Sequence, residues 1–190
     1  MKNQKLFYQP LELLVQQAQQ QDYKALEQLV KRVQKKIYTS FLYLNKSEEN
    51  IADLTQEALI KMVNALPNLK SPKAFNSWLN HIILNIFYDS MRKKQKKPEI
   101  ISIENENSYT QIPDKFVLPI EKAIFSEADK KIQKEIYNLP ENFRIAIILR
   151  ELQGLSYEEI SVVTNTTIGT VKSRIARARE RLQNSLKNYI

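Results

Sequence analysis

Hydrophobic side chains recur every three or four residues along most of the chain. The period is clearest near the N-terminus, at Leu11, Leu14, Val15 and Ala18 and then at Ala25, Leu26, Leu29, Val30, Val33 and Ile37. This spacing places apolar side chains on one face of an α-helix. We expect helices at about 10–20, 22–44, 51–65, 72–95, 121–138, 141–152, 156–163 and 169–186. The pattern therefore predicts an all-α fold.

The helical pattern is interrupted once, between residues 98 and 120. This segment has no sustained period, three prolines, and four acidic residues against one lysine. Such composition is typical of a linker. We therefore expect two helical domains, at 1–97 and 121–190, joined by an extended linker at 98–120. The glutamine run from Gln16 to Gln21 is expected to end a helix and to face solvent.

Local signals near the C-terminus predict two short helices joined by a turn. Gly154 follows one helix in the position that favours left-handed backbone, and Ser156 precedes Glu158 and Glu159 as an N-cap. Asn165 falls in the next turn, where a left-handed residue is needed. Helix, turn and basic helix form a helix-turn-helix motif, whose second helix can enter the major groove of DNA.

The second helix of this motif is amphipathic. Five of the eleven residues from Lys172 onward are basic. One face carries Val171, Ile175, Ala178 and Leu182, and another carries Lys172, Ser173, Ala176, Arg177 and Glu180. Taken alone, the segment also fits a solvated basic face on a helical bundle.

Composition narrows the possible functions. A formal net charge of +8 and a sequence pI near 9.5 favour a polyanionic partner. No apolar run approaches the roughly 20 residues that span a bilayer, and the first residues lack a signal peptide, so we expect no membrane insertion and a cytoplasmic protein. With no cysteine, one histidine (His81) and two glycines, we expect no metal, no cofactor and no enzyme activity.

The motifs resemble a known family. The stretch L-P-E-N-F-R-I-A-I-I-L-R-E-L-Q-G-L (139–155) and the following S-Y-E-E-I-S-V-V-T-N-T-T-I-G-T-V-K-S-R-I-A-R-A-R-E-R-L (156–182) resemble region 4 of bacterial sigma factors of the extracytoplasmic-function (ECF) type. The stretches D-L-T-Q-E-A-L-I-K-M-V (53–63), F-N-S-W-L-N-H-I-I-L-N (75–85) and M-R-K-K-Q-K-K (91–97) resemble region 2. The resemblance covers nearly the whole chain.

This resemblance implies roles for residues in the first domain. It places Asp53, Gln56 and Glu57 against core RNA polymerase, although their spacing alone fits a solvent-exposed face. It implies that the loop at 67–73, which includes Lys70, captures a flipped base of the minus-10 element together with Asn85, with Lys61 nearby. Phosphate contacts are expected from the basic cluster at Arg92, Lys93, Lys94, Lys96 and Lys97. The spacing of Trp78 assigns it to the core.

In the second domain the resemblance places Lys172, Ser173, Ala176 and Arg177 in the major groove of the minus-35 element. Thr170 and Arg174 are candidates for phosphate contacts. The chain departs from common family residues at Asn165, Thr167 and Ala176, so the promoter sequence stays open. The acidic linker residues Glu99, Glu104, Glu106 and Asp114 are expected to imitate nucleic-acid phosphates in the RNA path of the polymerase.

The expected partners are core RNA polymerase, promoter DNA and a separate anti-sigma factor, since no sensory extension is evident before Ile190. Two alternatives stay open from the residues. One is a stand-alone helix-turn-helix transcriptional regulator that senses a signal through residues 1–97. The other is a helical adaptor whose basic faces bind acidic proteins. The regulator should bind its operator without polymerase, and the adaptor should not bind DNA.

Overall fold

The computed structural model describes residues 9–46, 49–95 and 127–187, which form helices and turns without a β-strand. The elements are α2 (Leu11–Gln19), α3 (Tyr23–Leu44), α4 (Ile51–Ala65), η1 (Leu66–Asn68), η2 (Pro72–Ala74), α5 (Phe75–Gln95), α6 (Glu127–Asn138), α7 (Glu141–Ile147), η4 (Ile148–Leu152), α8 (Tyr157–Thr164) and α9 (Ile168–Leu186). The predicted all-α fold is confirmed. The linker at 98–120, its acidic residues, Lys96 and Lys97 lie outside the described residues.

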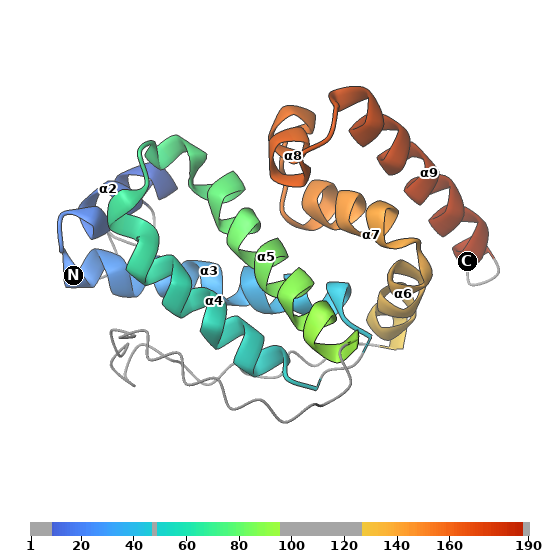
Figure 1. The fold of residues 1–190 in the computed structure, drawn as a ribbon, viewed down its shortest axis with the longest axis horizontal. Helices are drawn as coiled ribbons and strands as arrows, with labels where there is room; N and C mark the ends of the chain where they lie inside the picture. Colours follow the sequence, from blue (N-terminus) through green and yellow to red (C-terminus); the bar gives the residue numbers. More distant parts are fainter. Residues whose placement is uncertain (1–8, 47–48, 96–126, 188–190) are drawn as a thin grey trace.

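Helices α2 to α5 form the N-terminal half of the molecule (Figure 1). Helix α3 packs against α2 and α4, and α4 packs against α5. The aromatic side chains Phe41, Phe75 and Phe87 are fully buried between these helices. Trp78 is partly buried against this core, with its ring centroid 5.8 Å from that of Phe75. Its assignment to the core is confirmed.

A glutamine side chain fixes the segment between α4 and α5. The Gln19 side-chain amide donates hydrogen bonds to the backbone carbonyls of Leu66, at 3.0 Å, and Leu69, at 2.8 Å. The expectation that the whole glutamine run faces solvent is wrong for Gln19, which is half-buried. Backbone carbonyls left without helical partners need donors, and the amide of Gln19 supplies them across about 50 residues of sequence.

Helices α6 to α9 form the C-terminal half, in which α9 packs against α7 and α8. The single helix expected at about 141–152 is instead α7 followed by η4, a short π-helical segment. The Gln153 N–H donates to the carbonyl of Ile148 at 3.1 Å, five residues back, and the Leu155 N–H donates to that of Leu149 at 3.0 Å. This wider turn ends at Gly154, whose φ of 71° confirms the predicted left-handed residue.

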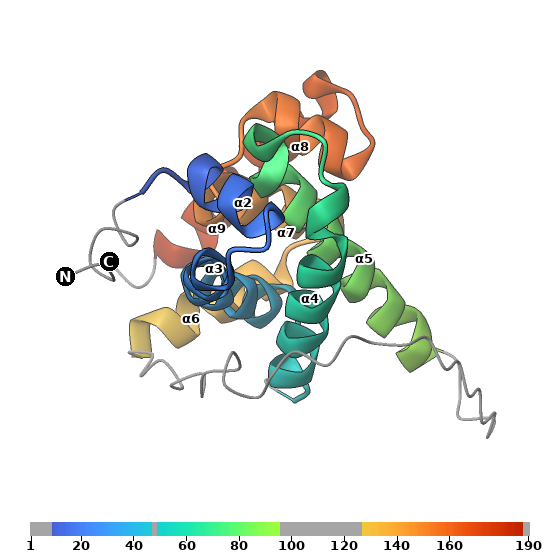
Figure 2. The ribbon, with the colours of Figure 1, turned by 90° about the vertical axis from the view of Figure 1, so that its left-hand side faces the viewer.

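The two halves pack against each other along α3 and α5. Helix α3 contacts α6 and η4, and α5 contacts α8. The halves lie side by side in Figure 1, and in the view of Figure 2 helices α7 and α9 lie behind the N-terminal half. The Gln153 side-chain amide donates to the Ser40 hydroxyl oxygen at 2.6 Å, and the Gln133 amide donates to the carbonyl of Leu42 at 3.1 Å. Residues 40–45 of α3 and its C-cap are all buried. This part of α3 is therefore covered on every side.

Two tyrosines lie where the halves meet. Burial raises the pKa of the Tyr43 phenol above its usual value near 10, and the charge of Asp129 on α6 raises it further. Burial also raises the pKa of Tyr88 on α5, as does Glu141 on α7, while Arg174 on α9 lowers it. In both cases an acidic residue of the C-terminal half disfavours a phenolate on the N-terminal half.

We predict that alkaline pH separates the halves. Because the pKa of Tyr43 is raised in the packed state, its contribution is complete below pH 10 and is lost as the pH rises through the raised pKa. The chain has no cysteine, so fluorophores on cysteines introduced at Asn64 and Gln183 can report the separation by energy transfer. In Tyr43→Phe the drop in transfer should move to higher pH. An unchanged midpoint in this variant would contradict the assignment.

Candidate nucleic-acid interface

The turn between α8 and α9 is built from side-chain caps. The predicted N-cap Ser156 is confirmed: its hydroxyl accepts from the Glu159 N–H at 3.1 Å, and the Glu159 carboxylate accepts from the Ser156 N–H at 2.7 Å. Asn165 ends α8 with a φ of 49°, as predicted. The hydroxyl oxygen of Thr167 accepts from the Thr170 N–H at 3.2 Å and so starts α9. These contacts form the expected helix-turn-helix geometry.

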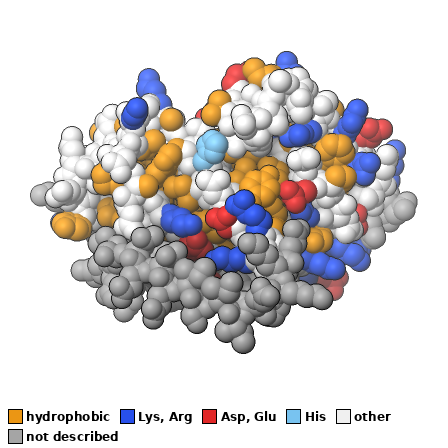
Figure 3. Space-filling model, in the orientation of Figure 1, with side chains coloured by type: hydrophobic (Ala, Val, Ile, Leu, Met, Phe, Trp, Pro, Cys, Tyr) orange, Lys and Arg blue, Asp and Glu red, His pale blue; other side chains and the backbone are white. Residues whose placement is uncertain are grey.

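Helix α9 presents one buried face and one exposed face. Val171, Ile175 and Ala178 are buried, and Leu182 packs partly against the core. The four residues expected in the major groove, Lys172, Ser173, Ala176 and Arg177, are all exposed. Thr170 and Arg174, the candidates for phosphate contacts, are half-buried. Basic side chains gather on the side of the molecule where α9 runs (Figure 3).

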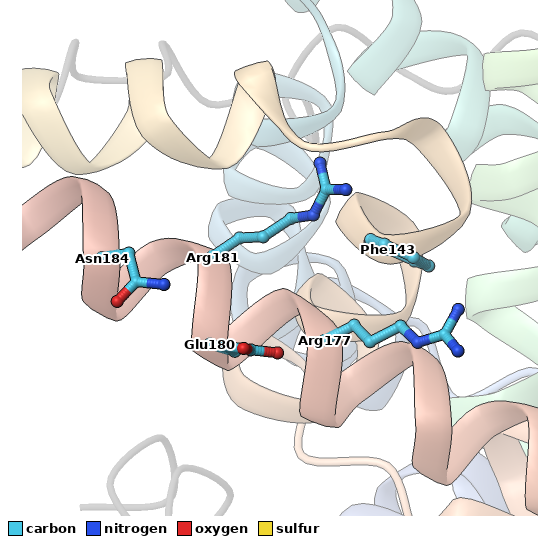
Figure 4. A pocket seen from close by; sticks show the side chains of 5 residues that line it. All are labelled: Phe143, Arg177, Glu180, Arg181 and Asn184. Carbon is cyan, nitrogen blue, oxygen red and sulfur yellow. The ribbon is translucent and has the colours of Figure 1, made fainter.

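The exposed face of α9 continues into a pocket beside α7. Four of its lining residues, Arg177, Glu180, Arg181 and Asn184, come from α9, and Phe143 comes from α7 (Figure 4). The Arg181 guanidinium lies over the Phe143 ring, 5.5 Å from its centroid, and such a contact orients a cation without neutralising it. The sequence patterns did not single out this pair, because it joins residues of two helices.

Other basic residues of the C-terminal half hold the fold. Arg144 is buried over the Tyr137 ring and donates to the Tyr137 carbonyl at 2.8 Å. Arg150 lies over the Tyr157 ring and donates to the Leu155 carbonyl at 2.8 Å. In both pairs arginine and tyrosine are seven residues apart, a spacing that a sequence search can find. Both guanidinium groups thus already make contacts within the fold.

A third arginine ties α9 to η4. The Arg179 guanidinium forms an ion pair with the Glu151 carboxylate at 2.6 Å, and the hydrogen bond to Glu151 raises the pKa of Arg179. Both side chains are about half exposed, so the pair fixes orientation more than stability. Lys172 and Arg177, in contrast, form no ion pair within the described part of the chain.

On α4 an ion pair joins Glu57, a candidate for polymerase binding, to Lys61, a candidate for DNA binding. Asp53 and Gln56 are exposed, and Glu57 is half-buried, as is Lys61. The Lys61 ammonium lies 2.7 Å from the Glu57 carboxylate. A residue expected to contact polymerase is thus bonded to one expected near DNA.

The remaining candidates lie before α5 and along it. Lys70 is exposed between η1 and η2, Asn85 is exposed in the middle of α5, and Arg92 and Lys93 are exposed near its end. Because a helix rises about 1.5 Å per residue, Asn85 is separated from Arg92 and Lys93 by about 10 Å along α5, so these side chains do not form one cluster. Arg92 is paired with Asp89.

Tyr88 is a partly exposed aromatic residue that none of the sequence motifs indicated. It is 37% exposed and lies three residues after Asn85, on the same side of α5. The sequence does contain a signal for Tyr88, because it follows the polar Asn85 by three residues. The apolar residues on either side of these two positions dominate the hydrophobic pattern of α5, so Tyr88 is easily assigned to the core.

Within the described ranges nothing supports metal chemistry or a membrane span. No group of three or more histidine, aspartate or glutamate side chains there could hold a metal ion. No helix in these ranges is both long and apolar enough to cross a bilayer.

Comparison with known proteins assigns the chain to a family. The model for sigma-70 region 2 matches residues 23–97, and that for sigma-70 region 4 matches residues 129–182. The chain is 35% identical to the ECF RNA polymerase sigma-E factor of Haemophilus influenzae over 93% of this chain and 95% of the relative. It is 36% identical to that of Escherichia coli K12 over 94% and 95%.

A solved structure agrees with this assignment. The sigma factor RpoE of Bartonella quintana, in complex with the anti-sigma factor NepR, is 27% identical with a TM-score of 0.66, over 86% of this chain and 98% of that one. The chain belongs to the ECF sigma factors of the sigma-70 family, which direct promoter-specific transcription initiation by RNA polymerase. The stand-alone regulator is not favoured, because a regulator has no need of sigma region 2.

We predict that removing the cap of α8 destabilises the helix-turn-helix. Ser156→Ala deletes the acceptor for the Glu159 N–H and should lower the free energy of unfolding by about 1 kcal/mol. Urea titration followed by circular dichroism measures this loss. Ser185→Ala is the control, because that hydroxyl bonds only to the carbonyl of Leu182 in its own helix. Equal losses in both variants would show that the cap is not responsible.

Proposed function

We propose that the chain divides promoter recognition between its two domains. Residues 1–97 bind core RNA polymerase and capture the minus-10 element, residues 98–120 link the domains, and residues 121–190 read the minus-35 element. The observation that carries the proposal is the exposed face of α9 at 172, 173, 176 and 177, which follows a capped turn. A recognition helix reads base edges from such a face.

The chemistry of this face suits base recognition. Arg177 carries a planar guanidinium that can donate two parallel hydrogen bonds to guanine, a contact that contributes about 1–3 kcal/mol of discrimination. Lys172 lies 6.0 Å from the centroid of the Tyr157 ring and carries a more flexible point charge. Ala176 presents only a methyl group, which fits apolar contact with thymine.

The first domain supplies groups for an unpaired strand. The exposed Asn85 amide both donates and accepts, so it can recognise the edge of a flipped base. Lys70, Arg92 and Lys93 are exposed cations along the same path. Lys61 can join them by leaving Glu57, since both side chains are partly exposed and such a pair four residues apart in a helix contributes only about 0.3–0.5 kcal/mol.

The spacing of the two promoter elements requires the halves to separate. Elements centred at minus 35 and minus 10 are roughly 25 base pairs apart, on the order of 85 Å of duplex. In the structure α5, which carries Asn85, packs directly against α8. One packed molecule cannot reach both elements, so we propose that the contacts between the halves open when the chain binds core polymerase.

We also propose a cytoplasmic location, where the polymerase acts, and an anti-sigma partner. Support for the partner comes from the RpoE structure, whose sigma factor is bound by NepR. An anti-sigma factor would act by holding the halves together. The polymerase performs the chemistry, and this chain contributes binding and no catalysis.

Transcription from a random promoter library tests the proposal directly. Bacterial core polymerase with this protein should initiate downstream of a recurring two-element motif, which sequencing of the transcripts reveals. Arg177→Ala should reduce the preference for one base at one position of the minus-35 element by about ten-fold, as expected for a loss of 1–3 kcal/mol of discrimination. Tight DNA binding by the protein alone, with no transcripts, would overturn the proposal.

A charge reversal on α4 tests the polymerase surface. Glu57→Lys should weaken binding to core polymerase at least ten-fold, because it places a cation where the proposed contact uses an acid. Glu27 provides a matched control: it pairs with Lys31 in the same i,i+4 geometry at 2.6 Å, on α3. Glu27→Lys should bind like the wild type in a fluorescence titration, and equal losses in the two variants would refute the assignment.

A further inference from the structure

The segment between α4 and α5, residues 66–74, is built from two single turns. The Leu69 N–H donates to the carbonyl of Leu66 at 3.1 Å, and the Ala74 N–H donates to that of Ser71 at 3.0 Å. Each of these hydrogen bonds closes one short turn of the chain, so neither ties the segment to another element. The orientation of the segment therefore has to be fixed by contacts from outside it.

Helix α2 supplies such contacts. It packs against η1 and η2, the two turns that precede α5 (Figure 1). Gln19, the last residue of α2, donates from its amide nitrogen to the carbonyls of Leu66 and Leu69, at 3.0 and 2.8 Å. An amide nitrogen carries two N–H bonds, and here each has its own acceptor. The two anchored residues also lie on the inner side of the segment, because Leu66 is buried and Leu69 packs partly against the core.

The residues next to these anchors form the outer side of the segment. The exposed ones are Pro67, Asn68, Lys70 and Ser71. Leu69 and Lys70 share one planar peptide unit, so the direction of the Leu69 carbonyl fixes the plane from which the backbone continues into Lys70. By holding this carbonyl, Gln19 sets the direction in which the first exposed cation of the segment leaves the domain.

We infer that Gln19 is a positioning residue for recognition of the minus-10 element. It acts through the segment 66–74: the amide holds the inner side of the backbone, and the outer side meets the unpaired strand in one fixed arrangement. A flexible segment can adapt to several bases, whereas a fixed one favours the base that fits it. The inference rests on the proposed capture of a minus-10 base in the first domain.

Two substitutions of Gln19 with opposite effects on the hydrogen bonds test the inference. Gln19→Glu has nearly the same shape, but an ionised carboxylate only accepts, so it cannot bond to either carbonyl. Gln19→Lys has a different shape but keeps donors for both carbonyls. Gln20→Glu and Gln20→Lys are the matched controls, because they make the same changes of charge one residue later, on an exposed side chain.

The measured quantity is the base preference at each promoter position, obtained by transcribing the random library with core polymerase and each variant. With Gln19→Glu the preference at one minus-10 position should fall about ten-fold, as expected when a carbonyl loses its hydrogen-bond partner. The preferences within the minus-35 element should not change. Gln19→Lys and both Gln20 variants should keep the preferences of the wild type. A general loss of stability would lower transcription from all promoters alike and would leave the ratios between bases unchanged.

The outcomes separate this inference from the proposed function. If the wild type yields no two-element motif, the proposed function fails and the inference fails with it. If the wild type yields the motif and Gln19→Glu keeps the minus-10 preference, only the inference is overturned. An equal loss with Gln19→Lys or with Gln20→Glu would also overturn it, because the amide donors of Gln19 would then not be the cause.

Discussion

The burial of the second half of α3 is the constraint on which the rest of the structure depends. Its first half has one side in the N-terminal core, but residues 40–45 are covered on every side because α6 and η4 pack on the remaining face. The two halves therefore share a continuous apolar core. The polar contacts across it include those that the glutamine amides at 133 and 153 make with groups of α3. Such hydrogen bonds can be exchanged for bonds to water at small net cost.

This arrangement explains why the net charge alone predicts so little about where DNA binds. Some basic side chains of the C-terminal half make contacts within the fold, and others are exposed to a ligand. Composition counts both kinds alike. Arg144 and Arg150 lie over tyrosine rings and bond to backbone carbonyls. Lys172 and Arg177 are exposed and form no ion pair in the described chain. Whether a basic side chain is held within the fold or stays exposed depends on the residues that it contacts. For Arg144 and Arg150 these partners, a tyrosine ring and a backbone carbonyl, are only five to seven residues away in sequence.

Local features could be predicted from the sequence, and distant contacts could not. The bounds of α4, the cap at Ser156 and the left-handed residues at 154 and 165 follow from a few neighbouring residues, and all are confirmed. The role of Gln19, whose partner carbonyls are 47 and 50 residues away, has no local signal. The same holds for Gln153 and Ser40, which are 113 residues apart. Of the candidate site, the exposed positions of α9 followed from its period, whereas Tyr88 and the contact between α5 and α8 did not.

The two glycines show how these kinds of information combine. A glycine is unfavourable in a helix or a turn unless its conformation or its surroundings require it. At 154 the backbone itself supplies the reason, and the sequence pattern was enough to predict it. At 169 the glycine lies in the first turn of α9 without a positive φ, and neither its backbone nor its surroundings require it. The structure is needed to tell these cases apart, because only the open space beside the Gly169 Cα excludes a packing reason.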